Sequence, residues 1–95
     1  MSDQTTRNAF ISSLDHLYAI AGQTSGGRPE ETIVKGPDGE MLRARRDEYL
    51  TDERGVEIAG EFIVGWDGVV SIDARDGILA LQLSDGRTVE IEACP

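Results

Sequence analysis

The sequence FIVGWDGVVSIDARDGILALQLSDGRTVEIE (residues 62–92) contains three Asp-Gly pairs spaced nine residues apart, each between short runs of branched apolar residues. The pairs are Asp67-Gly68, Asp76-Gly77 and Asp85-Gly86. Because Asp-Gly readily adopts the positive backbone angles of tight turns, this spacing predicts antiparallel strands joined by hairpins. We expect a β-meander at about residues 61–93.

The length of the last hairpin loop determines which side chains share a face of this meander. A three-residue loop, Ser84–Gly86, places Leu81 opposite Val89. The same loop places Leu79 opposite Ile91. A two-residue loop would set both leucines against polar residues. We therefore expect the three-residue loop.

The two earlier hairpins follow the same reasoning. A two-residue turn at Asp76-Gly77 aligns the apolar residues on its two sides, including Ile72 with Leu81. A three-residue loop at Trp66–Gly68 pairs Val64 with Val70. Together these registers predict one apolar face on the sheet, made of Phe62, Val64, Val70, Ile72, Leu79, Leu81, Leu83, Val89 and Ile91.

The N-terminal segment carries the stripe of an amphipathic helix. Its apolar residues recur at intervals of four, three and four, at Phe10, Leu14, Leu17 and Ala21. Gly22 then stands where a left-handed helix stop is expected. The pattern predicts a helix over about residues 4–21, followed by a glycine-containing linker at about 23–32.

The middle of the chain, about residues 33–58, is expected to hold a β-hairpin. Gly36-Pro37 and Asp38-Gly39 require a turn between two short apolar runs. Residues 40–50 are also rich in strong helix formers, so helix and strand both stay open for that segment.

A sheet with one apolar face is unstable until another element covers it, and the N-terminal helix carries the complementary stripe. We therefore predict an α+β fold, with the amphipathic helix packed on the antiparallel β-meander. A small β-barrel with a helical lid is the alternative. Ninety-five residues suffice for a single domain, 1–95.

Composition narrows the classes of partner. The chain has 18 acidic and 9 basic residues and a net charge of −9. Such a surface repels phosphates, which argues against direct binding of nucleic acid or of an anionic membrane and favours a basic protein partner. A single cysteine, Cys94, and a polar N-terminus without a long apolar stretch predict a cytoplasmic protein.

The predicted registers also gather acidic side chains on the outer face of the meander. Glu61, Asp73 and Glu90 share one cross-strand row, and Glu92 lies in the next row, which makes a compact carboxylate patch. Trp66, predicted at a hairpin tip, would either anchor an interface or fold back over the sheet. The plainer interpretation of the acidic residues is an ordinary solvated sheet face.

No catalytic or metal-binding pattern stands out. His16 is the sole histidine, and the adjacent Asp15 cannot orient it because neighbouring helical residues point about 100° apart. The Asp-Gly turns lack the ligand spacing of a calcium loop, and no phosphate-binding glycine motif is present. We expect no enzyme activity, no metal site and no cofactor.

The sequence thus predicts a non-enzymatic interaction protein that docks on a basic protein surface through Glu61, Asp73, Glu90, Glu92 and Trp66. A narrower version, suggested by size and charge only, is an inhibitor that mimics nucleic acid, as compact acidic phage proteins such as anti-CRISPR factors do. The alternative is a structural or self-assembling homo-oligomeric subunit that uses exposed apolar residues such as Ile63 and Ile78.

Overall fold

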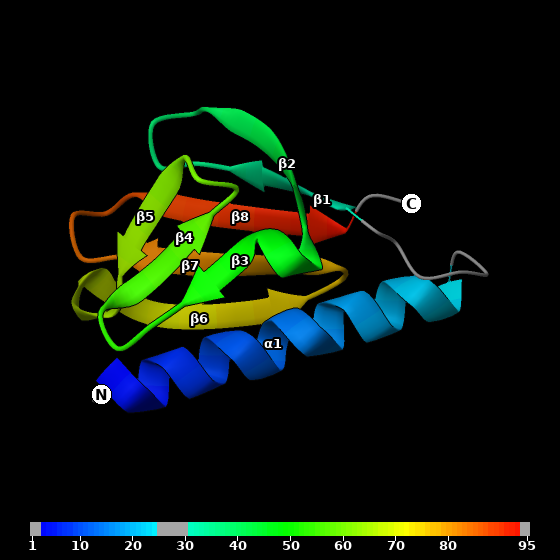
Figure 1. Cartoon of the computed structure of the whole chain (residues 1–95), viewed down its shortest axis with the longest axis horizontal. Coiled ribbons are helices and arrows are strands. Elements are labelled where there is room, and N and C mark those ends of the chain that lie inside the picture. The colour runs from blue at the N-terminus through cyan, green and yellow to red at the C-terminus, as the bar shows by residue number, and fades with distance from the viewer. Residues whose placement is uncertain (1–2, 25–30, 94–95) are drawn as a thin grey trace.

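The computed structural model describes the backbone of residues 3–24 and 31–93 and the side chains of residues 3–19 and 31–93. Over these residues it is an α+β fold, with one N-terminal helix packed on eight antiparallel strands in two sheets (Figure 1). The strands of the described part do not close into a barrel. The first of the two expected architectures is therefore confirmed.

The elements follow one another as α1 (Asp3–Thr24), β1 (Glu31–Lys35), β2 (Met41–Arg45), η1 (Arg46–Glu48), β3 (Tyr49–Thr51), β4 (Gly55–Ile58), β5 (Phe62–Gly65), η2 (Trp66–Gly68), β6 (Val69–Arg75), β7 (Ile78–Leu83) and β8 (Thr88–Ala93). The large sheet has the strand order β2-β1-β8-β7-β6, and the small sheet has the order β3-β4-β5. Two 3-10 turns join the sheets: β2 continues through η1 into β3, and β5 continues through η2 into β6.

The middle segment forms the expected β-hairpin, and the helix-forming residues 40–50 do not form an α-helix. β1 and β2 pair as the expected hairpin, with Val34 opposite Leu42. Residues 40–50 then form a strand, one 3-10 turn and a second strand. The apolar residues Ala44 and Tyr49 are buried in the core on either side of this turn, so tertiary packing outweighs the helix propensity of the charged residues between them.

The predicted register between β7 and β8 is confirmed, and the one between β6 and β7 is confirmed as far as Ile72, whereas Val69 and not the predicted Val70 lies opposite Leu83. Leu81 lies opposite Val89, and Leu79 lies opposite Ile91. Across the two-residue turn, Ile72 lies opposite Leu81. Asp76 and Gly77 take φ angles of 54° and 77°, the positive values for which Asp-Gly was expected at this turn.

The third register is wrong. Val64 lies opposite Val56 of β4, because β5 belongs to the small sheet and does not pair with β6. Val70 is 61% exposed, whereas its neighbour Val69 lies opposite Leu83 and is buried. The physical reason is an irregularity in β6 between Val69 and Ser71, which turns the alternate set of side chains inward.

The helix is longer than predicted. It runs from Asp3 to Thr24 and passes through Gly22, where we expected it to end. A glycine inside a helix costs about 1 kcal/mol relative to alanine but does not stop it. The expected stripe is buried at Phe10, Leu14 and Leu17. The side chain of Ala21 and residues 25–30 of the expected linker lie outside the described part.

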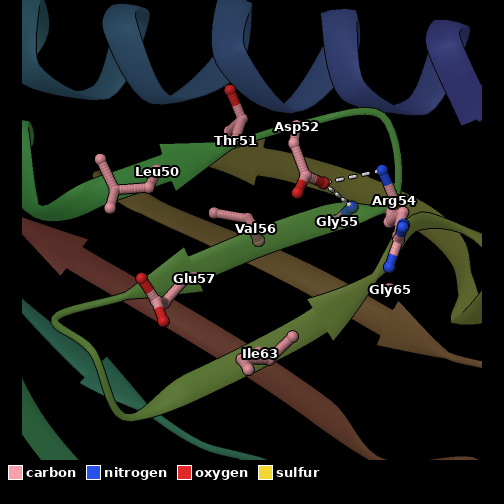
Figure 2. A pocket seen from close by; sticks show the side chains of 9 residues that line it. All are labelled: Leu50, Thr51, Asp52, Arg54, Gly55, Val56, Glu57, Ile63 and Gly65. Atoms are coloured by element: carbon pink, nitrogen blue, oxygen red, sulfur yellow. Dashed lines mark hydrogen bonds between the residues drawn. The ribbon is translucent and has the colours of Figure 1, made fainter.

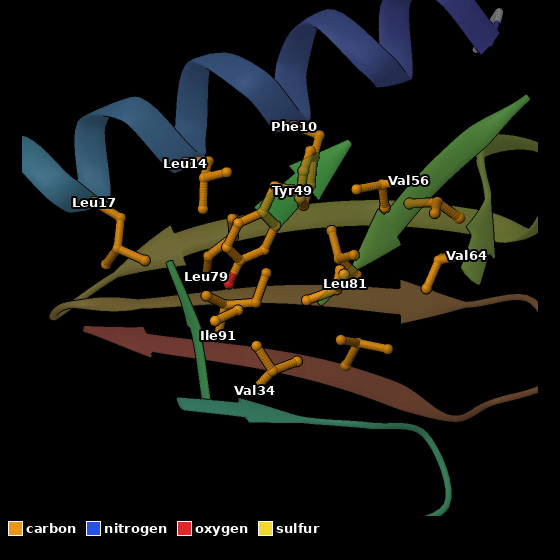
Figure 3. Close-up of a cluster of buried hydrophobic side chains, with 14 of the residues drawn as sticks. Phe10, Leu14, Leu17, Val34, Tyr49, Val56, Val64, Leu79, Leu81 and Ile91 are labelled. Carbon is orange, nitrogen blue, oxygen red and sulfur yellow. The ribbon is translucent and has the colours of Figure 1, made fainter. Parts of the chain in front are cut away.

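Helix α1 and the small sheet cover the same face of the large sheet, and the core lies between these layers. Figure 3 shows side chains of α1 and of the small sheet converging on β7 and β8. The buried apolar cluster contains Phe10, Leu14, Leu17, Val34, Ala44, Tyr49, Val56, Ile58, Val64, Trp66, Val69, Leu79, Leu81, Val89 and Ile91. Most of the predicted apolar face is therefore in the core.

A pair of buried hydroxyl groups links the two sheets. Thr32 of β1 donates its hydroxyl proton to the carbonyl oxygen of Ala44 over 3.1 Å. The hydroxyl of Tyr49 in β3 lies 2.5 Å from the Thr32 Oγ1. Because the one hydroxyl proton of Thr32 is donated to Ala44, Tyr49 is the donor in this second hydrogen bond.

Candidate functional site

Three of the predicted contact residues lie on the outer face of the large sheet. Asp73 lies opposite Ala80, and Ala80 lies opposite Glu90, so the two carboxylates share one cross-strand row. Glu92 lies on β8 two residues from Glu90 and on the same face. This part of the predicted arrangement is confirmed as geometry.

Glu61 does not belong to that row. It lies in the turn between β4 and β5, where its backbone N–H donates to the carbonyl oxygen of Ile58 over 3.0 Å. The prediction placed Glu61 beside Asp73 because it paired β5 with β6, whereas β5 pairs with β4. The four carboxylates are therefore divided between the two sheets.

Basic residues neutralise the outer face of the large sheet. Lys35 of β1 lies opposite Glu90, and Arg75 forms an ion pair with Asp73. The strand registers place four acids and four bases on this face: Glu31, Asp73, Glu90 and Glu92 with Lys35, Arg43, Arg45 and Arg75. The face has no net charge because β1 and β2, which carry three of the bases, pair alongside β8.

Trp66 is buried rather than exposed at a loop tip. It is 1% exposed, its ring centroid lies 5.5 Å from that of Phe10, and its Nε1–H donates to the carbonyl oxygen of Asp52 over 2.9 Å. The second alternative for this residue, folding back over the sheet, describes its position. A side chain packed in this way has no surface to offer a partner, so we remove Trp66 from the candidate contact residues.

The excess negative charge lies around the small sheet. Residues 46–68 contain seven acids and two bases: Asp47, Glu48, Asp52, Glu53, Glu57, Glu61 and Asp67 with Arg46 and Arg54. All seven acids are exposed or half-buried. Arg46 is held by an ion pair with Asp15 of α1 at 2.9 Å. More than half of the net charge of the chain therefore lies in this short segment.

The outer face of the small sheet also exposes apolar side chains. Leu50, Glu57 and Ile63 form one cross-strand row over β3, β4 and β5 (Figure 2). Leu50 is 60% exposed and Ile63 is 79% exposed. Glu57 is the middle member of the row, so this face presents two exposed apolar side chains on either side of a carboxylate.

A shallow groove of about 460 Å³ runs beside this row. Gly55 lies opposite Gly65 in the next outward row, so bare backbone forms part of the groove floor. Gly55 has no room for a side chain, because a Cβ there would lie 2.1 Å from the carbonyl oxygen of Val64. Close approach of two strands therefore explains the glycine.

Asp52 shapes one end of this groove. Its Oδ1 accepts hydrogen bonds from the backbone N–H groups of Arg54 at 2.8 Å and Gly55 at 3.0 Å, which fixes the tight turn between β3 and β4. These two hydrogen bonds hold the pKa of the Asp52 carboxyl below its usual value. The carboxylate is thus a fixed negative charge at the end of the groove.

A second hollow, of about 230 Å³, borders the side of β5 that faces away from β4. It lies between β5, η2 and the loop that joins β7 to β8. Arg87, which lines it, contacts the carboxylates of Asp85 at 2.6 Å and Asp38 at 2.7 Å. Ile63 and Gly65 line both hollows, so the two meet at β5.

The described residues offer no arrangement for catalysis or metal binding that we can identify. In residues 3–24 and 31–93, no three His, Cys, Asp or Glu side chains cluster in a way that could hold a metal ion. Asp15, which neighbours His16 in sequence, is paired with Arg46 and does not orient the imidazole. No helix in the same residues has the length and apolar character needed to cross a membrane.

Reasoning from sequence missed the small sheet as a candidate site. The net charge of the whole chain does not reveal where along the sequence the surplus of acidic residues lies. A window over residues 46–68 would have found it. Comparison with models of known protein families, with curated proteins and with solved structures gave no match in any of the three.

Proposed function

We propose that the protein is a non-enzymatic binding protein whose acidic small sheet docks on a basic surface of another protein. One observation carries the proposal: residues 46–68 contain seven acids and two bases, and within this segment Leu50 and Ile63 are exposed on either side of Glu57. Surplus negative charge steers a basic partner to this face, and the side chains of Leu50 and Ile63 supply apolar surface to bury once contact is made.

A narrower form of the proposal is mimicry of nucleic acid. Proteins that bind nucleic acids present basic grooves, and a small domain with closely spaced carboxylates can occupy such a groove. An inhibitor of the anti-CRISPR type would act in this way. The size of the domain and the density of its negative charge support this form of the proposal. A protein that acts in this way would be located in the cytoplasm, as the sequence predicts.

Charge reversal on the two sheets tests the proposal. One variant combines Glu57→Lys with Glu61→Lys on the small sheet. A matched variant combines Asp73→Lys with Glu90→Lys on the large sheet and changes the net charge by the same amount. Each is used as bait in host extract at about 0.05 M and about 0.5 M salt, since screening at the higher salt weakens contacts between exposed charges.

Wild type and the large-sheet variant are expected to retain the same basic proteins at low salt, and the small-sheet variant is expected to lose them. Loss with the large-sheet variant alone would return the docking site to Asp73 and Glu90. Identical recovery with all three baits, at both salt concentrations, would contradict docking by charge.

Self-assembly remains the competing function, because Ile63 is highly exposed and β5 has an unpaired side in the described part. Sedimentation at two protein concentrations separates the two functions. A salt-insensitive dimer that is lost in Ile63→Ser would replace the proposal with a homo-oligomeric subunit.

A further inference from the structure

We propose that the basic partner binds as an extended segment, which adds a fourth strand to the small sheet along the free side of β5. This inference rests on the proposed function and specifies how the partner is held. Addition of a strand to a sheet edge is a common mode of peptide recognition, in which the backbone gives affinity and alternate side chains give specificity.

The free side of β5 presents unpaired backbone groups. β5 pairs with β4 on one side, and no strand of the described residues pairs with its other side. The N–H of Trp66 donates to the carbonyl oxygen of Arg54 over 2.9 Å, so the backbone groups of Trp66 point toward the side of β4. Hydrogen-bonding direction alternates along an antiparallel strand, so Val64 also faces β4. Ile63 therefore points its N–H and C=O groups away from β4, and Gly65 points its N–H the same way, whereas the Gly65 C=O is the first acceptor of the 3-10 turn η2.

The other three sheet edges are protected in ways that β5 is not. β2 carries Arg43 and Arg45, and β6 has an irregularity and lies against α1. On β3, the carbonyl oxygen of Thr51 accepts a hydrogen bond from Arg7 of α1 at 3.4 Å. Charges, bulges and covering elements are the usual protection against edge pairing. β5 reads Phe-Ile-Val-Gly, with no charge and no proline.

Space for an added strand lies beside this edge. The outer groove and the 230 Å³ hollow meet at β5. Side chains alternate between the two faces of a strand, so an added segment would place one set over the outer groove beside Ile63 and the other set in the hollow. Gly65 has no side chain, and the carboxylate of Asp67 lies close to the position that a Cβ would take there.

The charges of the hollow select a basic segment. Asp67 and Asp85 both line it. The one base lining it, Arg87, is already engaged by the carboxylates of Asp85 and Asp38, and Asp67 makes no ion pair within residues 3–24 and 31–93. The occupant is therefore a strand of alternating apolar and basic residues. Placed antiparallel, it would exchange about two hydrogen bonds with Ile63 and accept about one from the N–H of Gly65.

Two substitutions at Gly65 isolate the backbone contact. Gly65 has a φ of −79°, which suits the proline ring, so Gly65→Pro removes the outward N–H without breaking a bond to β4. Gly65→Ala adds the same Cβ and keeps the N–H. In both variants the Cβ meets only a movable group at short range, the Asp67 Oδ1 at 2.8 Å. Circular dichroism and thermal unfolding would verify that both variants fold.

The probe is the peptide acetyl-Lys-Val-Lys-Val-Lys-amide, with its affinity measured by titration calorimetry at low salt. We expect Gly65→Ala to bind within about threefold of wild type and Gly65→Pro to bind about tenfold more weakly, the effect of losing one hydrogen bond worth about 1.4 kcal/mol. The same peptide methylated on both valine nitrogens cannot donate to β5 and is expected to lose at least as much.

The outcomes separate this inference from the proposed function. Equal, salt-sensitive affinity for wild type, Gly65→Ala and Gly65→Pro would overturn strand addition while leaving docking by charge in place. Absence of peptide binding to wild type would overturn strand addition, and the charge-reversal experiment would still decide the proposed function. A wild-type homodimer abolished by Gly65→Pro would show that the edge receives a second copy of this chain instead of a basic segment.

Discussion

The two sheets of this protein have the same kind of buried face and opposite kinds of outer face. The large sheet places four acids and four bases outward, with Lys35 beside Glu90 and Arg75 paired with Asp73. The small sheet exposes Leu50 and Ile63 within a segment that has seven acids and two bases. The charges on the outer face of the large sheet therefore balance, whereas the outer face of the small sheet is both acidic and apolar.

This difference indicates a division of labour between folding and binding. The large sheet supplies most of the strands that line the core, whereas the three short strands of the small sheet present the uncompensated charge. Like charges close together destabilise a sheet. This destabilisation affects the small sheet. A few large buried side chains, above all Trp66 and Tyr49, hold the small sheet to the rest of the protein. Substituting these side chains tests whether the two sheets unfold separately.

Trp66→Ala is expected to have the largest effect. The substitution empties a core position where Trp66 contacts Phe10 of α1 and also removes the hydrogen bond to Asp52. The expected loss is about 3–5 kcal/mol in the free energy of unfolding, measured by urea denaturation. Leu50→Ala, at an exposed position, is the control and should change stability by less than about 0.5 kcal/mol.

Hydrogen exchange on Trp66→Ala would sharpen the comparison. If the sheets are separable, amide protection should fall in β3–β5 while β7 and β8 keep theirs. Equal loss of protection in both sheets would show one cooperative unit and would contradict the division of labour. A cost below about 1 kcal/mol would contradict the role of Trp66 as an anchor.

Gly55→Ala is the next test, because it strains the small sheet without touching the large one. The new Cβ would lie 2.1 Å from the carbonyl oxygen of Val64, so β4 and β5 must move apart. We expect a loss of about 1–3 kcal/mol, the usual range for overpacking, in thermal or urea unfolding. Gly68→Ala is the matched control, since nothing lies within 4 Å of its added Cβ. An equal effect at both positions would mean that the close approach at Gly55 is unimportant.

How far the fold could be predicted differs between the same two regions. The β6–β8 registers were predictable from loop length and apolar pairing, because a one-residue slip would have set Leu79 and Leu81 against polar residues. The helix was predictable from its 3.6-residue stripe. In both cases neighbouring residues along the chain carry the information.

The small sheet could not be found in this way. Its existence depends on β5 pairing back to β4 instead of forward to β6, and on Trp66 turning inward to reach Phe10, which lies more than 50 residues earlier in the sequence. Val64 fits an apolar partner in either pairing, so the local pattern cannot choose between Val56 and Val70. The candidate site moved with that choice, since Glu61 belongs to whichever sheet contains β5.

Tyr49→Phe is expected to have the smallest effect of the substitutions at the contact between the two sheets. It removes the hydroxyl that donates to Thr32, while Thr32 keeps its bond to the carbonyl oxygen of Ala44. The expected loss at neutral pH is about 1 kcal/mol, since no donor is left unpaired. Thr32→Val removes the opposite end of the same bond and should cost more, because it leaves the buried Tyr49 hydroxyl without its partner.

The same variant makes a prediction about pH. Burial raises the pKa of Tyr49 well above its ordinary value, so the folded protein keeps a proton that the unfolded chain releases near pH ~10. Stability is therefore unaffected below about pH 10 and falls as the pH rises above it. In Tyr49→Phe the alkaline fall in the free energy of unfolding should be shallower than in wild type, with the remainder due partly to Tyr18, whose pKa burial also raises. Identical alkaline slopes in the two proteins would show that the hydroxyl of Tyr49 titrates freely and that water, rather than the core, lies between the sheets at this point.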